Sequence, residues 1–186
     1  MRRIFDVLVA LGLMLILAPL FLLVVLGVRL TSAGPVLFRT RRVGKNSGLF
    51  TMYKFRTMRI DTPQVATHLL KEPAQFLTPL GAFFRRTSLD ELPQLINVLS
   101  GDMTLIGPRP ALFNQDDLVA LRTARGVDAL TPGITGWAQV NGRDELPIPE
   151  KVKLDEWYLR NRSLWLDLKI LGMTVFKVIR KEGVVH

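Results

Sequence analysis

The segment from Arg85 to Gln94 carries the residue types that phosphate chemistry needs. Its sequence, RRTSLDELPQ, places the carboxylates of Asp90 and Glu91 side by side shortly after two arginines. Guanidinium groups bind phosphate, and two adjacent carboxylates can divide the work of nucleophile and Mg²⁺ ligand. The segment therefore indicates phosphoryl chemistry. Asp90 and Glu91 are the catalytic and metal-binding candidates, and Arg85 and Arg86 are candidates for binding the substrate.

The same segment also matches a motif that only starts a helix. Ser88, followed three residues later by Glu91, forms a capping box whose side chains satisfy free backbone N–H groups. Pro93 argues against Ser88 as the cap, because it would then remove a hydrogen bond inside the helix. With Asp90 as the cap, Pro93 falls in the first turn, where its missing N–H is harmless. Both interpretations place the acids at a helix N-terminus, and capping alone is the alternative to chemistry.

Two further arginines lie in turns whose backbone is restricted. Arg109 stands between Pro108 and Pro110, and Arg143 follows the turn-forming pair Asn141-Gly142. Arginines held in this way suit bidentate contacts with phosphate. Surface salt bridges are the alternative role for both.

What the chain lacks excludes several other kinds of site. It has no cysteine and only two histidines, so thiolate and imidazole metal sites are excluded and any metal would be a hard ion such as Mg²⁺. The phosphate-binding motifs GxxxxGK[ST] and GxGxxG and the hydrolase motif GxSxG are also absent from the sequence. A formal net charge of +9 predicts an anionic partner such as lipid headgroups, a nucleotide or a nucleic acid.

A long apolar segment precedes these motifs. Residues 7–28 contain no charged or polar side chain, and as a straight helix they would extend roughly 33 Å, about the thickness of a hydrocarbon core. Pro19 near the middle opposes a straight helix, and basic residues flank both ends, which favours the cytoplasmic side for both. We therefore predict a re-entrant helix that breaks at Ala18 and Pro19 and returns to the same side. A spanning helix with a tolerated proline is the alternative.

We predict a helix-rich α+β fold on a monotopic membrane protein. Residues 1–34 are expected to form the helix-break-helix, and residues 35–186 a cytoplasmic catalytic domain. A β-hairpin is expected from strands at 36–42 and 49–56, and a loop with one short helix at 61–79. The sequence further predicts helices at 89–99, 112–125, 149–160 and 164–180, a loop at 131–136 and an extended piece at 137–140. The last helix has an apolar stripe that suits either a membrane surface or packing on the core.

Several blocks in one order resemble a known family, the monotopic phosphoglycosyl transferases, also called bacterial sugar transferases. The resemblance covers nearly the whole chain, and the length is similar to that of the small members without an extra membrane bundle. Besides the broken apolar helix, the matching blocks are KFRTM at 54–58, SLDELPQ at 88–94, GDM at 101–103, IGPRP at 106–110, PGITG at 132–136 and QVNGR at 139–143.

The resemblance implies a reaction and roles for individual residues. A phosphosugar would pass from a UDP-sugar to undecaprenyl phosphate, a polyprenyl phosphate, with release of UMP. Asp90 would be the nucleophile that carries the phosphosugar covalently, and Glu91 the Mg²⁺ ligand of the pair. Arg109 and Arg143 would contact the phosphates or the nucleotide sugar, and Lys54 is a further substrate-binding candidate.

The same resemblance implies a setting in the cell. It predicts a protein of the bacterial inner membrane with its catalytic domain on the cytoplasmic face, in contact with membrane lipid. The reaction would be the first membrane step of polysaccharide or glycoconjugate assembly, followed by glycosyltransferases, and no nucleic acid is expected as a partner. One position departs from the family pattern, because Ala18 stands where many relatives have a serine before the proline.

Two other functions explain part of the sequence. A basic module that binds an anionic membrane without chemistry would account for the net charge, although not for the acids and arginines in restricted turns. A lipid-phosphate hydrolase would use the same acids with water as the final acceptor. Both stay open as alternatives to the transferase.

Overall fold

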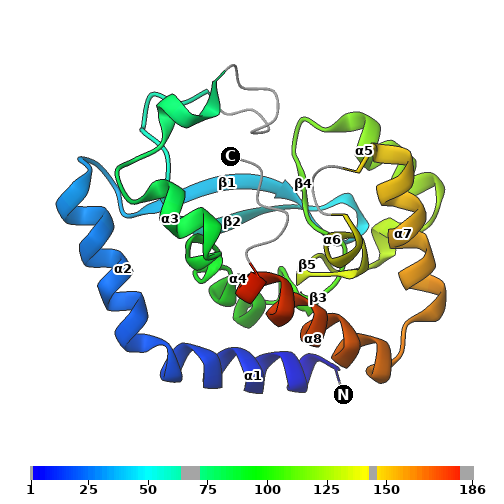
Figure 1. Ribbon diagram of the computed structural model, residues 1–186. Coiled ribbons are helices and arrows are strands. Elements are labelled where there is room, and N and C mark those ends of the chain that lie inside the picture. Colours follow the sequence, from blue (N-terminus) through cyan, green and yellow to red (C-terminus); the bar gives the residue numbers. More distant parts are fainter. Residues whose placement is uncertain (1, 64–71, 143–145, 181–186) are drawn as a thin grey trace.

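The computed structural model describes residues 2–63, 72–142 and 146–180, and it places helices around two small β-sheets (Figure 1). The predicted helix-rich α+β class is confirmed. In chain order the elements, with η for 3₁₀ turns, are α1 (Arg2–Ile16), α2 (Ala18–Thr31), β1 (Leu37–Val43), η1 (Lys45–Ser47), β2 (Leu49–Phe55), η3 (Pro73–Phe76), α3 (Gly81–Arg86), η4 (Leu89–Glu91), α4 (Gln94–Ser100), β3 (Thr104–Ile106), β4 (Ala111–Leu112), α5 (Asp116–Ala124), η5 (Val127–Ala129), β5 (Gly133–Thr135), α6 (Trp137–Asn141), α7 (Ile148–Asn161) and α8 (Leu164–Arg180).

The apolar segment forms two helices, α1 and α2, which meet at Leu17 with a bend of 64°. The predicted break is confirmed, and its cause is Pro19, which lies in the first turn of α2 where no N–H is needed. Among the described residues no single helix is long and apolar enough to cross a membrane, whereas this bent pair meets that length and composition criterion when its halves are taken together.

The predicted hairpin is confirmed as the antiparallel pair β1 and β2. Its register pairs Leu37 with Phe55 at the open end and Val43 with Leu49 at the turn. Strand β4 joins the other edge of β1, so the sheet has the order β2-β1-β4. The helix expected at 112–125 begins only at Asp116, because Leu112 belongs to β4 and residues 113–115 form the turn that follows it.

The predictions for residues 131–140 were wrong. Residues 133–135, expected in a loop, form β5, which pairs in parallel with β3. A Cβ atom at Gly133 would lie 2.1 Å from the backbone nitrogen of Gly107, so only glycine permits this approach of the two chains. Residues 137–140, expected to be extended, lie in α6, in which Val140 N–H donates to the Gly136 carbonyl at 3.1 Å.

The helix predicted at 89–99 is divided. A 3₁₀ turn, η4, contains the two acids, and α4 begins only after Pro93. The capping box is not formed, because Ser88 has a left-handed backbone with φ of 56° and its side chain caps nothing. Helices α7 and α8 match their predictions, and in the described part of 61–79 the predicted short helix is the 3₁₀ turn η3.

The bent helix pair rests on two hydrophobic clusters. Helix α1 contributes Ala10 to the main core, together with Val98 of α4 and Ile170 of α8. Helix α2 contributes Val24 and Val28 to a second cluster that includes residues of β2 and α3. The outer faces of both helices nevertheless leave large apolar side chains exposed, among them Ile4, Leu8, Leu15, Leu22, Leu26 and Leu30.

Helix α8 shows a similar division between two faces. Leu166 and Ile170 are buried against the main core. The predicted apolar stripe lies elsewhere on the helix, with the side chains of Trp165, Leu168 and Val175 exposed and Trp165 at 77%. The helix therefore packs on the core and also presents an apolar stripe outward.

Candidate active site

Asp90 and Glu91 lie together in the tight turn between α3 and α4. The left-handed conformation of Ser88 reverses the chain after α3, and Pro93 then starts α4. Asp90 is buried, with 6% of its surface exposed. The side chain of Glu91 is about a fifth exposed, at 21%.

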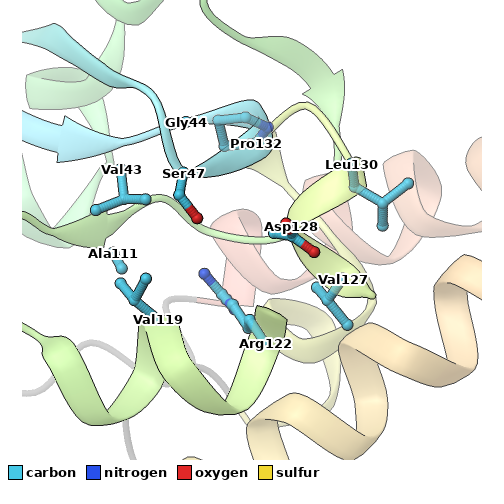
Figure 2. Close-up of a pocket in the computed structure, with 10 residues that line it drawn as sticks. All are labelled: Val43, Gly44, Ser47, Ala111, Val119, Arg122, Val127, Asp128, Leu130 and Pro132. Atoms are coloured by element: carbon cyan, nitrogen blue, oxygen red, sulfur yellow. The ribbon is translucent and has the colours of Figure 1, made fainter. Parts of the chain in front are cut away.

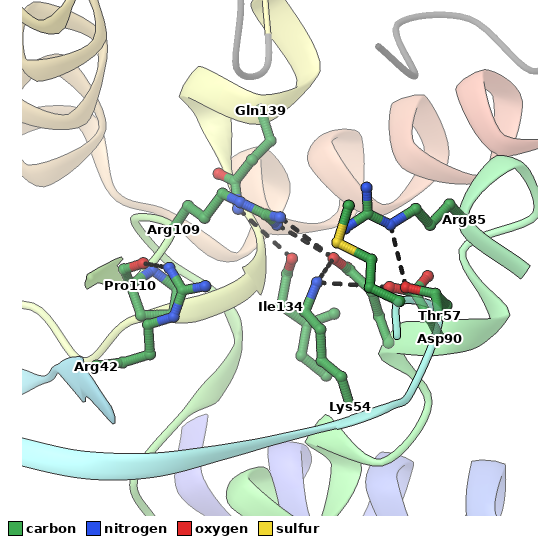
Figure 3. Close-up of polar contacts among 11 residues, drawn as sticks. Arg42, Lys54, Thr57, Arg85, Asp90, Arg109, Pro110, Ile134 and Gln139 are labelled. Atoms are coloured by element: carbon green, nitrogen blue, oxygen red, sulfur yellow. Dashed lines mark hydrogen bonds and ion pairs between the residues drawn. The ribbon is translucent and has the colours of Figure 1, made fainter. Parts of the chain in front are cut away.

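Lys54 reaches both acids from the end of β2 (Figure 3). Its Nζ lies 2.7 Å from Glu91 Oε1 and 3.6 Å from Asp90 Oδ2. The buried side chain of Asn97 fixes β2 against α4, because its Oδ1 accepts from Tyr53 N–H at 3.1 Å and its Nδ2 donates to the Thr51 carbonyl at 2.7 Å. The strand that carries Lys54 is thereby tied to the helix that follows the two acids.

Arg109, from the loop after β3, contacts the same carboxylate oxygen of Glu91 as Lys54 does. Both of its terminal nitrogens lie 3.3 Å from Glu91 Oε1. The backbone of Arg109 is held by Arg122, which donates to its carbonyl at 2.8 Å. Arg122 is itself fixed by Asp155, with nitrogen–oxygen distances of 3.0 and 2.7 Å in a buried ion pair. Sequence reasoning missed Arg122 and Asp155, because an arginine and an acid on separate polar helices carry no local signal.

The remaining predicted residues occupy different places. Arg85 lies near the acids, where its Nε donates to Thr57 Oγ1 at 3.1 Å and its charge acts on Asp90. Arg86 is exposed at the end of α3, and among the described residues it makes no hydrogen bond or ion pair. Arg143 lies outside the described residues. The structure thus brings together Lys54, Arg85, Asp90, Glu91 and Arg109.

The two neighbouring acids have opposite electrostatic environments. Burial raises the pKa of Asp90 above the ordinary value of 3.8, and the charge of Lys54 only partly opposes this effect. Burial also disfavours ionisation of Glu91, but the charges and hydrogen bonds of Lys54 and Arg109 dominate and lower its pKa to about 2. Glu91 is therefore an anion at neutral pH, whereas Asp90 keeps its proton to a higher pH than an ordinary aspartic acid does.

The sequence model of the bacterial sugar transferases matches residues 1–181, which include all of these side chains. The chain belongs to the bacterial sugar transferase family. It is 44% identical over 184 residues to the uncharacterized sugar transferase EpsL of Bacillus subtilis (strain 168), covering 99% of this chain and 90% of that protein.

Two further relatives of this sugar transferase carry names that state a reaction. It is 40% identical to the UDP-glucose:undecaprenyl-phosphate glucose-1-phosphate transferase of Escherichia coli (strain K12), over 95% of this chain and 40% of that protein. It is 36% identical to the undecaprenyl-phosphate galactose phosphotransferase of Salmonella typhimurium, over 98% of this chain and 41% of that protein. The chain thus spans about two-fifths of the length of these two enzymes.

The described residues of this sugar transferase fit a Mg²⁺ site that the substrate would complete. Among residues 2–63, 72–142 and 146–180, no group of three or more His, Cys, Asp or Glu side chains could hold a metal ion. Mg²⁺, however, is commonly bound by one or two carboxylates together with substrate phosphates and water. Asp90 and Glu91 supply such a pair of oxygen ligands, so the chain fits an ion that arrives with a diphosphate substrate.

A small cavity elsewhere in this sugar transferase is not the substrate site. It has a volume of about 30 Å³ and lies between the hairpin turn, α5 and η5, with Val43, Val119, Arg122 and Leu130 among its lining residues (Figure 2). That volume admits water but not a nucleotide sugar, since pockets for ligands of such size occupy about 300 Å³ or more.

Proposed function

We propose that this sugar transferase moves a phosphosugar from a UDP-sugar to undecaprenyl phosphate and releases UMP. The observation that carries the proposal is the buried carboxylate of Asp90, which lies beside the ion pairs that Glu91 forms with Lys54 and with Arg109. The chain also belongs to the bacterial sugar transferase family. The names of two relatives state sugar-phosphate transfer to or from undecaprenyl phosphate, which supports the same substrates here. The reaction would begin polysaccharide or glycoconjugate assembly.

The proposed reaction has two displacements at one phosphorus atom. A carboxylate oxygen of Asp90 attacks the phosphorus that bears the sugar, the bond from that phosphorus to the bridging oxygen breaks, and UMP leaves. A phosphate oxygen of undecaprenyl phosphate then attacks the same phosphorus and displaces the Asp90 carboxylate. The products are a lipid-linked diphosphosugar and the regenerated acid. Lys54 and Arg109, which pair with the two acids, would stabilise negative charge on the phosphates in both steps.

We propose Glu91, with Asp90, as the protein ligands of Mg²⁺. A bound Mg²⁺ ion would neutralise charge on the diphosphate. The low pKa of Glu91, about 2, keeps this ligand ionised over the whole physiological range. Glu91 also keeps Lys54 and Arg109 beside the acids, at 2.7 and 3.3 Å from its Oε1.

We further propose that the protein is monotopic and lies on the cytoplasmic face of the inner membrane. The bent pair α1–α2 would enter one leaflet and return, with its exposed apolar side chains in lipid. The outward stripe of α8, which includes Trp165 and Leu168, would lie at the interface, where tryptophan is favoured. This arrangement would hold the acids near the depth of a lipid phosphate.

An assay with purified full-length protein, Mg²⁺, undecaprenyl phosphate and a panel of UDP-sugars tests the proposal. We expect UMP release and a lipid-linked diphosphosugar with at least one donor, and loss of both when EDTA is added. Mass spectrometry of protein incubated with the donor alone should find a phosphosugar on Asp90. Free sugar phosphate would instead indicate the hydrolase, and no UMP with any donor would indicate a binding module.

A further inference from the structure

Asp6 is a buried acid in α1, and all the residues of α1 that follow it are apolar. Only 8% of its surface is exposed. Its Oδ2 accepts a hydrogen bond from Thr104 Oγ1 at 2.6 Å, and its Oδ1 accepts one from the backbone N–H of Leu105 at 3.3 Å. The first turns of α1 are therefore bonded directly to β3.

These bonds occupy the edge of β3 that β5 does not use. On the paired side, Thr104 N–H donates to the Pro132 carbonyl at 2.9 Å, and Thr104 and Ile106 are the residues of β3 that pair with Gly133 and Thr135 of β5. Successive N–H groups of a strand point to opposite edges, so that of Leu105 points away from β5. The Asp6 carboxylate therefore accepts the hydrogen bond from Leu105 N–H that a neighbouring strand would otherwise accept.

Strand β3 leads directly into the loop that carries Arg109. Ile106 ends the strand, and Arg109 follows three residues later with its guanidinium at 3.3 Å from Glu91. Any shift of β3 would move this contact. Anchoring α1 to the core does not by itself require an acid, because Ala10 and other apolar side chains of α1 already pack there, and burying a carboxylate is costly unless its bonds serve a purpose.

We propose that Asp6 is a positioning residue for phosphosugar transfer, which holds β3, and through it Arg109, at a fixed place relative to the membrane helix. The inference rests on the proposed function. Asp6 touches no reactant, and its effect on turnover passes through Arg109.

Double-mutant kinetics on the full chain in detergent test this coupling. Asp6→Leu should lower kcat between about tenfold and about a hundredfold, the cost of misplacing a catalytic group by a fraction of an ångström to an ångström. In an Arg109→Ala background the same change should lower kcat by less than about threefold, because the group it positions is gone. Asp6→Asn, which keeps an acceptor, should retain most activity. Asp116→Leu, at an exposed acid that starts α5, is the matched control and should match the unaltered protein.

Equal fold losses in the two backgrounds, or an unimpaired Asp6→Leu protein, would overturn the proposal. Amide hydrogen exchange gives a readout that needs no turnover: Asp6→Leu should speed exchange at residues 104–110 and leave residues 49–55 unchanged. Unchanged exchange at 104–110 would also overturn it. An unaltered protein that releases no UMP would contradict the proposed function instead, and the exchange result would still decide whether Asp6 holds β3.

Discussion

Asp90 and Glu91 are adjacent in sequence, yet their surroundings separate their protonation behaviour. Glu91 faces Lys54 and Arg109 and has a pKa of about 2, whereas burial raises the pKa of Asp90. Where environments push two titratable groups apart in this way, their roles in a reaction usually differ. The charged member suits a constant electrostatic task, and the buried member suits bond formation.

Replacing Asp90 by asparagine should abolish turnover while leaving nucleotide binding in place. The amide cannot form the covalent bond, so kcat should fall by about a thousandfold or more, as losses of catalytic nucleophiles do. UMP release measures the first effect and calorimetric titration with UDP measures the second. Asp116→Asn, at an exposed acid that starts α5, is the control and should stay near normal. Normal turnover of Asp90→Asn would eliminate Asp90 as the nucleophile.

Lys54 should control the acidic limb of the pH profile. In the proposed reaction Asp90 must be ionised to attack, so kcat/KM should fall as pH decreases through its pKa. The charge of Lys54 lowers that pKa, and its removal must raise it. In Lys54→Met the acidic limb should therefore move to higher pH, while Lys54→Arg should leave it nearly in place. A limb that moves to lower pH, or not at all, would contradict the assignment.

The two acids and Arg109 could be chosen from the sequence, because the acids are adjacent and follow two arginines, and Arg109 stands between two prolines, whereas Lys54 was indicated only by the family resemblance. The residues that hold these side chains in position could not be chosen in this way. Asn97 and Tyr53 are 44 residues apart and Arg122 and Asp155 are 33 apart, and only the folded chain brings each pair together. A buried asparagine or a buried ion pair has the same sequence appearance as a surface residue.

At the level of elements, local physics predicted the long features. Pro19 breaks the apolar helix, and alternating β-prone residues form the hairpin β1–β2. The short strands β3 and β5 were missed, because three residues carry too little pattern and their pairing depends on close contact at Gly107 and Gly133. Whether these strands form depends on contacts between segments that are far apart in the sequence.

Gly136 offers a test of that close contact. A Cβ atom there would lie 2.0 Å from the Gly107 carbonyl oxygen, two residues before Arg109. Gly136→Ala should therefore destabilise the protein by about 1–3 kcal/mol, the usual cost of overpacking, and it should also lower turnover. Thermal unfolding and UMP release measure the two effects.

Gly172 in α8 provides the opposite case for the same chemical change. A Cβ atom there meets nothing within 4 Å, so Gly172→Ala should stabilise the helix by roughly 0.5–1 kcal/mol and leave turnover unchanged. Equal effects of the two alanines would show that the close approach of the backbone at Gly107 and Gly136 is not the constraint.

At the level of the whole molecule, exposed apolar surface gathers on three helices. Helices α1 and α2 run along the outer edge of the molecule, and α8 lies beside α1, where Arg2 pairs with Asp167 at 3.2 Å (Figure 1). Composition predicted the apolar helix pair. It could not predict which face of α8 is outward, because Leu166 and Ile170 are as apolar as the exposed stripe.

Single cysteines should report the topology of the helix pair, since the natural sequence contains none. Arg2→Cys, at the partly exposed first residue of α1, and Ala33→Cys, just beyond α2, should both react with an impermeant maleimide from the cytoplasmic side of inverted vesicles. Neither should react in right-side-out vesicles. Labelling from opposite sides would establish a spanning segment in place of the re-entrant one.

The bonds that tie the first turn of α1 to the core have a consequence for biogenesis. Arg3 and Asp6 bond to residues 95 to 99 positions later, at Val98, Leu99, Thr104 and Leu105. The ribosome completes the apolar helices long before those partners exist, so the nascent N-terminus can be taken up by lipid while its polar anchors are still unmade. In the proposed membrane setting, the chain would insert first and dock its catalytic half afterwards.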